Sequence, residues 1–146
     1  MKLTSVNFAQ NGTIPSEFTC DSTNVNPELN IHDVPKNVKS LALIMDDPDA
    51  VVGTFVHWVV WNIPAETKKI QKNSEPSGVN GKGGSGKLSY IGPCPPSGTH
   101  RYVFKLYALD TMIQLPEGSG KADLEKAMHD HIIEKTELMG LYKRIK

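Results

Sequence analysis

Along the first three quarters of the chain, apolar residues fall in short runs separated by clusters of Gly, Pro, Asn and Asp. Four runs predict β-strands: residues 3–8, 38–45, 54–64 and 100–110. The second run is continuously apolar, as in a buried strand, whereas the third is rich in β-branched and aromatic residues and the fourth alternates strongly. Because no helical pattern separates these runs, they favour an antiparallel β-sandwich.

The last quarter of the chain changes to a helical period. Between residues 121 and 140, five residues share one face of an α-helix: Leu124, Ala127, Met128, His131 and Ile132. Ser119 or Gly120 could cap the start of this helix, and Gly140 could end it. We therefore predict a C-terminal helix over 121–140 and a short final strand over 140–145.

The chain length predicts a single domain over residues 1–146, long enough for a hydrophobic core of its own. Residues 74–87 are rich in Gly and Ser and predict a long surface loop. Residues 81–87 have the Gly and Lys spacing of a phosphate-binding P-loop, but Leu88 stands where Mg²⁺ requires Ser or Thr. Since the loop also lacks a preceding strand and a following helix, we exclude a P-loop.

Charge and cysteine content narrow the class of protein. With 16 basic and 16 acidic residues, the net charge of zero gives no indication of a general nucleic-acid or membrane-binding surface. The sequence contains no apolar run of about 18 residues and no apolar core of an export signal, so we predict a cytoplasmic protein. Cys20 and Cys94 could pair, but two cysteines do not make a disulfide scaffold, and we expect free thiols.

Carboxylates follow the buried strand that ends near residue 45. Pro48 fixes its own φ and favours extended geometry at Asp47. Asp47 and Asp49 could then face one cleft while Asp46 points elsewhere. An Asx-turn that merely ends the strand explains the same residues, and the pattern alone favours this simpler interpretation.

The other two strands carry histidines. In the strand over 54–64, alternation places His57 on the face of Val59 and Trp61, where a core histidine is the simpler interpretation. In the strand over 100–110, His100 and Tyr102 share one face, while Arg101 points to the other.

A stiff turn precedes the second histidine strand. Pro95 and Pro96 have little conformational freedom to lose and can form the wall of a pocket.

Three kinds of site would use these polar residues at three strand ends: Asp47, Asp49, His57, His100 and Tyr102. They could ligate zinc or ferrous iron, but no HxH, HxxxH or CxxC pair lies among them. They could serve a hydrolase, but no Ser lies in a GxSxG motif and Cys94 has no helix dipole to lower its pKa. The third possibility is an anion pocket, because nearby carboxylates favour protonated histidine, which donates two hydrogen bonds.

Two motifs that contain these residues resemble the phosphatidylethanolamine-binding protein family, also called the Raf kinase inhibitor protein-like family. They are DDPDAVVGTFVHWVVWNIP at 46–64 and GPCPPSGTHRYVFKLYALD at 92–110, and the sequence is most similar to the short bacterial and archaeal branch. Weaker similarity covers residues 18–29 and 121–144, so that the resemblance spans nearly the whole chain.

The resemblance implies a mostly β fold, with two antiparallel sheets in a Greek-key sandwich and a C-terminal α-helix beside a small anion pocket. The pocket of the family accepts phosphate, phosphoethanolamine, acetate or cacodylate. The positions that match the family's site motifs are Asp47, Asp49, His57, Gly92, Pro95, Pro96, His100 and Tyr102. Val51 stands where the family usually has proline, and Ile91 where it usually has glycine.

Our leading hypothesis is a non-enzymatic protein that binds a small anionic or phosphorylated ligand, with no metal or cofactor. His57 and His100 would supply positive charge, while Tyr102 and backbone amides near Gly92 would donate hydrogen bonds. The two site carboxylates would hold the imidazoles and a cationic end of the ligand.

Two alternatives stay open. The resemblance allows a kinase or protease inhibitor that acts through surface loops such as 74–87, and it allows a homodimer. The other alternative is an enzyme, either a metal-dependent or a cysteine hydrolase. Trp58 and Trp61 are predicted to lie in the core rather than at an interface.

Overall fold

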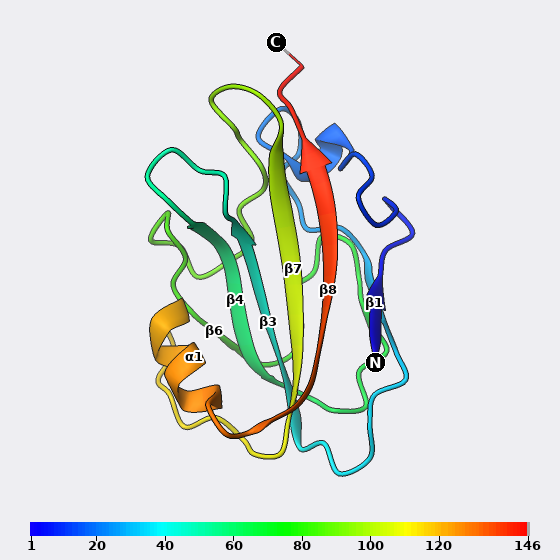
Figure 1. Ribbon diagram of the computed structural model, residues 1–146, viewed down its shortest axis with the longest axis vertical. Helices are drawn as coiled ribbons and strands as arrows, with labels where there is room; N and C mark the ends of the chain where they lie inside the picture. Colours follow the sequence, from blue (N-terminus) through cyan, green and yellow to red (C-terminus); the bar gives the residue numbers. More distant parts are fainter. Residues whose placement is uncertain (146) are drawn as a thin grey trace.

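The computed structural model describes residues 1–145, and a five-stranded antiparallel sheet forms the centre of the fold (Figure 1). Its strands, in spatial order, are β6 (Val79–Asn80), β4 (Phe55–Ile63), β3 (Ser40–Asp47), β7 (His100–Leu109) and β8 (Ile132–Tyr142). A second sheet has three short strands in the order β1 (Lys2–Thr4), β2 (Leu29–His32) and β5 (Lys69–Ile70). The fold also contains the 3₁₀ turn η1 (Ser16–Phe18) and the helix α1 (Lys121–Met128). The predicted two-sheet architecture with a C-terminal helix is confirmed.

Both faces of β3, which lies in the middle of the large sheet, are buried, and this explains why β3 is apolar without alternation. Toward the small sheet, Leu43 and Met45 of β3 join a cluster that includes Leu3 and Ile31 of the small sheet. On the opposite face a second cluster packs against α1. Its members are Ala42, Ile44, Val59, Trp61, Tyr107, Leu109, Ile113, Leu124 and Met128. The strand pattern of the sequence therefore produces a layered arrangement of small sheet, large sheet and helix, with α1 (orange) beside β4 and β6 (Figure 1).

The C-terminal helix is shorter than predicted. It ends at Met128, and residues Ile132–Tyr142 form β8, which pairs with β7 along its whole length. Asp130 adopts a φ of 69°, which is incompatible with continuing the helix. The helical spacing that continues to His131 and Ile132 is overridden by the ladder to β7. Gly140 lies inside β8, not at a helix end.

Asp46 anchors the helix to the sheet from the face opposite the small sheet. Its carboxylate is buried and accepts hydrogen bonds from Lys105 at 3.0 Å and from Lys121, the first residue of α1, at 2.7 Å. Two ammonium groups therefore neutralise a carboxylate that would be costly to bury alone. The prediction that Asp46 points away from its neighbour Asp47 is confirmed.

The two cysteines form a disulfide, so the prediction of free thiols is wrong. The Cα atoms of Cys20 and Cys94 lie 5.4 Å apart, although the residues are 74 positions apart in the chain. The loops that carry them pack closely: the Cys20 amide donates to the Pro93 carbonyl at 3.1 Å, and the Tyr90 hydroxyl donates to the Phe18 carbonyl at 2.8 Å. The positions of two cysteines in the sequence do not indicate that the loops carrying them lie side by side.

Both tryptophans lie in the core, as predicted, and are at most 1% exposed. The indole of Trp58 donates to the Glu75 carboxylate at 2.9 Å, which ties the loop after β5 to the large sheet. The indole nitrogen of Trp61 has no hydrogen-bond partner among residues 1–145.

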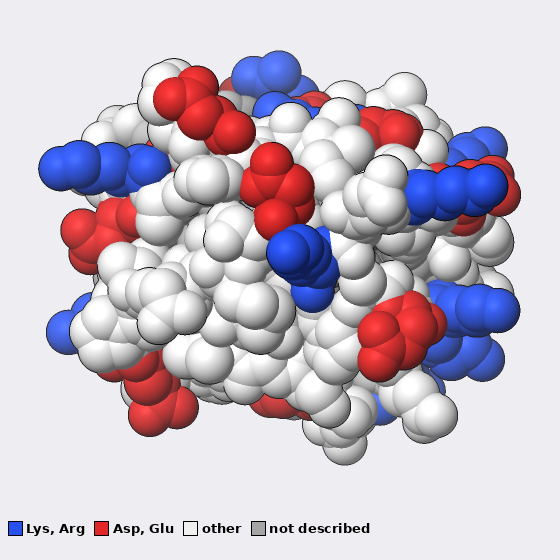
Figure 2. All heavy atoms as spheres, turned by 90° about the horizontal axis from the view of Figure 1, so that it is seen from below, with Lys and Arg blue, Asp and Glu red and all other residues white. Residues whose placement is uncertain are grey.

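Charged groups of both signs are interspersed on the end of the molecule shown in Figure 2, in keeping with the zero net charge. None of the helices in the described part of the chain has the length and apolar character needed to cross a membrane.

Candidate ligand-binding pocket

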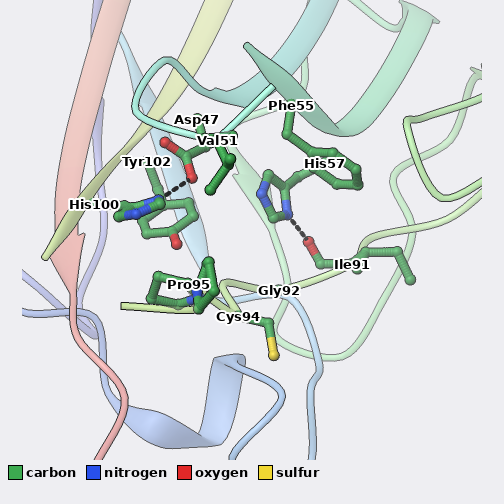
Figure 3. Close-up of a pocket in the computed structure, with 12 residues that line it drawn as sticks. Asp47, Val51, Phe55, His57, Ile91, Gly92, Cys94, Pro95, His100 and Tyr102 are labelled. Atoms are coloured by element: carbon green, nitrogen blue, oxygen red, sulfur yellow. Dashed lines mark hydrogen bonds and ion pairs between the residues drawn. The ribbon is translucent and has the colours of Figure 1, made fainter. Parts of the chain in front are cut away.

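One cavity of about 280 Å³ lies where the end of β3, the start of β4 and the start of β7 meet the loop that precedes β7 (Figure 3). It is lined by Asp47, Ala50, Val51, Phe55, His57, Ile91, Gly92, Cys94, Pro95, Pro96, His100 and Tyr102. Seven of the eight positions that the sequence singled out therefore come together, and Asp49 is the one that does not.

Asp47 and His100 form a buried pair on one side of the cavity. The Oδ2 of Asp47 lies 2.7 Å from the Nδ1 of His100, and the side chains are only 5% and 10% exposed. Oδ1 of Asp47 accepts a hydrogen bond from the backbone amide of Asp49 at 2.7 Å. Because a carboxylate only accepts, Nδ1 of His100 carries a proton and Nε2 is left for a ligand. The predicted shared face of His100 and Tyr102 is confirmed.

A β-bulge delivers His57 to the opposite side of the cavity. Met45 of β3 pairs with Trp58, but the next residue, Asp46, pairs with Val56, so His57 is the extra residue in β4. Strict alternation, which would put His57 beside Val59 and Trp61, is therefore wrong here. The bulge turns the His57 ring toward the pocket.

Aromatic contacts on two sides hold the His57 ring. It meets Tyr102 edge-to-face at a centroid distance of 5.3 Å and Phe55 at 4.9 Å. The ring is therefore fixed by packing, and its orientation does not depend on a ligand.

The protonation state of His57 differs from the expected positive charge. Its Nδ1 lies 2.6 Å from the carbonyl oxygen of Ile91, which can only accept, so Nδ1 carries the proton. Burial lowers the pKa of His57 from its ordinary value of 6.5 and outweighs the opposing effects of the Ile91 carbonyl and the Asp47 carboxylate. His57 is thus neutral near pH 7. Its other nitrogen, Nε2, points toward Tyr102 and the cavity (Figure 3) and is a hydrogen-bond acceptor.

Asp49 binds Arg101 instead of facing the cavity, which corrects the prediction that it shares a cleft with Asp47. Its carboxylate accepts hydrogen bonds from the Arg101 guanidinium at 2.9 and 2.8 Å and from the Arg101 backbone amide at 2.9 Å. The outward direction predicted for Arg101 is confirmed. The hydrogen bonds from Arg101 lower the pKa of Asp49 to about 2, because they stabilise the charged carboxylate. The pair fastens the loop between β3 and β4, which carries Ala50 and Val51 of the cavity wall.

Replacing this guanidinium tests the assignment. In an Arg101→Gln variant, we expect the pKa of Asp49 to return from about 2 toward the ordinary value of 3.8. Since the folded-state pKa is depressed, the stabilisation is complete above about pH 3.8 and is lost as the pH falls through about 2. Carboxyl-carbon NMR titration measures the change. Arg144→Gln is a matched control, because Arg144 pairs with Asp21. An unchanged Asp49 titration in Arg101→Gln would contradict the pairing.

The floor of the cavity is polar and its rim is apolar. Burial, with a smaller effect of the Asp47 carboxylate, raises the pKa of the Tyr102 hydroxyl well above its usual value, so this group stays protonated and can donate. The rim is formed by Val51, which is 82% exposed, together with Phe55, Ile91 and Pro96. Sequence reasoning identified Val51 and Ile91 only as departures from a family pattern and missed Phe55. Phe55 lies two residues before His57 and so shares its face of the strand, but this spacing indicates the pocket only once the bulge has shown that His57 faces it.

The other predicted chemistries fit less well. Among residues 1–145, no group of three His, Cys, Asp or Glu side chains is arranged to hold a metal ion. The sulfur of Cys94 is bonded to Cys20 and so is not available as a nucleophile while the disulfide is intact. Among residues 1–145, none of those that line the cavity belongs to α1, so the helix does not lie beside the cavity as the resemblance implied.

Comparison with known sequences identifies relatives along nearly the full chain. A family model described as phosphatidylethanolamine-binding protein matches residues 4–143. A UPF0098 protein from Methanothermobacter thermautotrophicus is 46% identical over 99% of both chains. Another, from Pyrococcus horikoshii, is 46% identical over 99% of this chain and 77% of its own length.

Two solved structures share the fold. A phosphatidylethanolamine-binding protein homolog from Chlamydia trachomatis superposes with a TM-score of 0.95 and 37% identity, covering 98% of this chain and 97% of that one. E. coli YbcL, described as a member of the mammalian PEBP family, superposes with a TM-score of 0.91 and 28% identity over 98% of both chains.

Proposed function

Because the chain belongs to the phosphatidylethanolamine-binding protein family, we propose that its pocket binds a small anionic or phosphorylated ligand and does not transform it. The observation that carries the proposal is the pair of histidines in one cavity. In each ring Nδ1 is engaged by the protein, by Ile91 for His57 and by Asp47 for His100, and Nε2 has no hydrogen bond to residues 1–145.

The cavity offers hydrogen-bonding groups of both kinds around one small volume. Tyr102 donates through its hydroxyl, and His100 donates through Nε2 when it is protonated. Asp47 and the neutral His57 accept, so a ligand with both anionic oxygens and donor groups is matched better than a simple anion. The apolar rim accommodates a carbon portion that extends toward solvent. A phosphorylated headgroup such as phosphoethanolamine combines these properties.

The proposed role is binding rather than catalysis. A covalent mechanism needs an activated nucleophile, and the described part of the cavity wall holds no serine, threonine or lysine. The carboxylate of Asp47 is engaged by His100 and by the Asp49 amide. The one cysteine in the wall is oxidised.

We expect the imidazole signals of His57 and His100 to shift when phosphate or phosphoethanolamine is added at millimolar concentration. A His100→Ala variant should weaken binding by about 10-fold or more, because a hydrogen bond to a charged group is worth about 1.5–3 kcal/mol. His129→Ala is a matched control, since His129 is 81% exposed and lies at the end of α1. Both ligands leaving both imidazoles unmoved would refute the proposal.

Inhibition of a kinase or protease, a homodimeric state and a cytoplasmic location stay predictions. The loop 74–87, through which an inhibitor could act, is partly fastened, because Glu75 accepts hydrogen bonds from Trp58, Asn80 and the Tyr90 amide. Disulfides persist mainly in oxidising compartments, so the Cys20–Cys94 bond does not favour the cytoplasm.

A further inference from the structure

One side of the cavity presents a hydrogen-bond acceptor, the Nε2 of His57, to a site that we propose takes an anion. The His57 ring is 5% exposed, and its Nδ1–H is committed to the Ile91 carbonyl at 2.6 Å. Since a neutral imidazole has one donor and one acceptor, Nε2 presents a lone pair to the cavity. An oxyanion without a proton would place its own lone pair against this one.

Burial favours this neutral state, whereas the two carboxylates near His57 raise its pKa and so oppose the neutral state without reversing it. Asp47 at the end of β3 is negatively charged, and Asp46 lies on the other face of the same strand between two lysines. From β7 the ring faces Tyr102, and His100 lies across the cavity.

The remaining cavity wall brings no charge that would change this balance. It consists of Ala50, Val51, Phe55, Ile91, Gly92, Cys94, Pro95 and Pro96. No lysine or arginine lines the cavity among the described residues, so a positive charge there can come only from one of the two histidines. A donor for Nε2 of His57 therefore has to come from the ligand.

Resting on the proposed function, we propose that the pocket selects oxyacids that retain one proton, such as a phosphate monoester or a phosphonate, and discriminates against sulfate esters and sulfonates. The retained hydroxyl of the ligand donates to Nε2 of His57, and His57 is the residue that determines this specificity. Whether the shared proton rests on the ligand oxygen or on Nε2, the complex contains one proton more than the separate neutral ring and fully ionised ligand.

The different acid strengths of phosphate monoesters and sulfate esters explain this selectivity. A phosphate monoester loses its second proton near pH 6, so its monoanion carries one P–OH group in the mildly acidic range. A sulfate ester carries the same charge and a similar shape but has no proton to share. Leaving a buried acceptor without a donor is strongly unfavourable, and sites of this kind can reject an analogue that lacks one hydroxyl.

Methyl phosphate and methyl sulfate at pH 6 provide a matched pair of probes. For the wild-type protein, we expect methyl phosphate to bind at least about 10-fold more tightly, measured by calorimetry or by NMR titration. The ratio of the two affinities should fall by about 10-fold per pH unit above pH 6, as the methyl phosphate loses its proton. Using the ratio removes any contribution from protonation of His100, because both ligands experience it equally.

Substitution of His57 tests the residue assignment. In His57→Gln the side-chain amide can rotate to donate, so the preference for methyl phosphate should fall to about twofold or less while methyl sulfate binding improves. His129→Gln makes the same change at an exposed position and should keep the wild-type ratio. If His57→Gln fails to fold, ¹⁵N NMR of the wild-type protein decides the question. The inference expects an unprotonated Nε2 in the free protein and a large change on adding methyl phosphate.

The outcomes separate this inference from the function on which it rests. Equal affinities for the two probes at pH 6 would overturn the selectivity and leave anion binding intact. A protonated Nε2 of His57 in the free protein would overturn it as well. Binding of neither probe, nor of inorganic phosphate, would overturn the proposed function and the selectivity together.

Discussion

Removal of the Cys20–Cys94 disulfide is expected to lower the free energy of unfolding by about 4 kcal/mol. The bond closes a loop between residues 74 positions apart, and loop-closure entropy of that length corresponds to about 4 kcal/mol, within the usual range of 2–5 kcal/mol. Urea denaturation of a Cys20→Ser/Cys94→Ser variant against the oxidised wild type measures the difference. We expect a clearly lower midpoint for the variant.

The disulfide also fastens one wall of the cavity. Cys94 lies between Gly92 and Pro95, which both line the site, and the bond joins this loop to the segment after η1. We therefore expect phosphate affinity to decrease in the double variant. Reduction of the wild type should reproduce both effects, whereas the same reductant should leave the variant unchanged. Equal denaturation midpoints for the oxidised wild type and the double variant would show that the bond does not stabilise the fold.

Gly92→Ala is expected to destabilise the protein by roughly 3 kcal/mol, at the upper end of the range for overpacking a buried position. A Cβ at this position would lie 2.0 Å from the carbonyl oxygen of Phe18 and 2.5 Å from Oδ1 of Asn24. The first of these atoms is backbone, so the conflict is relieved only by separating the two loops. That movement would also break the hydrogen bond from the Gly92 amide to Asn24, which is 2.8 Å long.

A second glycine provides the control for this substitution. A Cβ added at Gly120, which precedes α1, would meet no atom within 4 Å, and the φ of this residue is −90°, so Gly120→Ala should be tolerated. Thermal unfolding measures stability, and phosphate titration measures the pocket, which we expect to lose affinity only in Gly92→Ala. Equal melting temperatures of the two variants would show that the loops separate at little cost.

The strand-borne part of the site follows from local pattern. The period of two places His100 and Tyr102 on one face of β7 and Arg101 on the other, and the structure has this arrangement. The continuous apolar run of β3 correctly indicates a strand buried on both faces. The turn before β7 is read correctly as a pocket wall because Gly92, Pro95 and Pro96 reach the cavity.

Other residues were placed wrongly for identifiable reasons. His57 reaches the cavity through a bulge, and alternation assumes that there is none. Asp49 accepts hydrogen bonds from Arg101, which lies 52 positions away in the chain, and therefore does not face the cavity. The helical spacing that continues past Met128 is overridden by pairing of β8 with β7. In each case a long-range contact decides between conformations that local sequence allows almost equally.

The sequence by itself determined the long strands β3, β4 and β7, the two-sheet architecture, the family and most of the residues around the pocket. These properties depend on side-chain periodicity and on motifs that are contiguous in the chain. Only the tertiary structure decided that Cys20 forms a disulfide with Cys94 and that Arg101 pairs with the Asp49 carboxylate. It also decided that His57 is neutral, with an acceptor nitrogen facing the cavity. The physical reason is that pairing and protonation depend on distance and burial, which arise when segments far apart in the sequence are packed together.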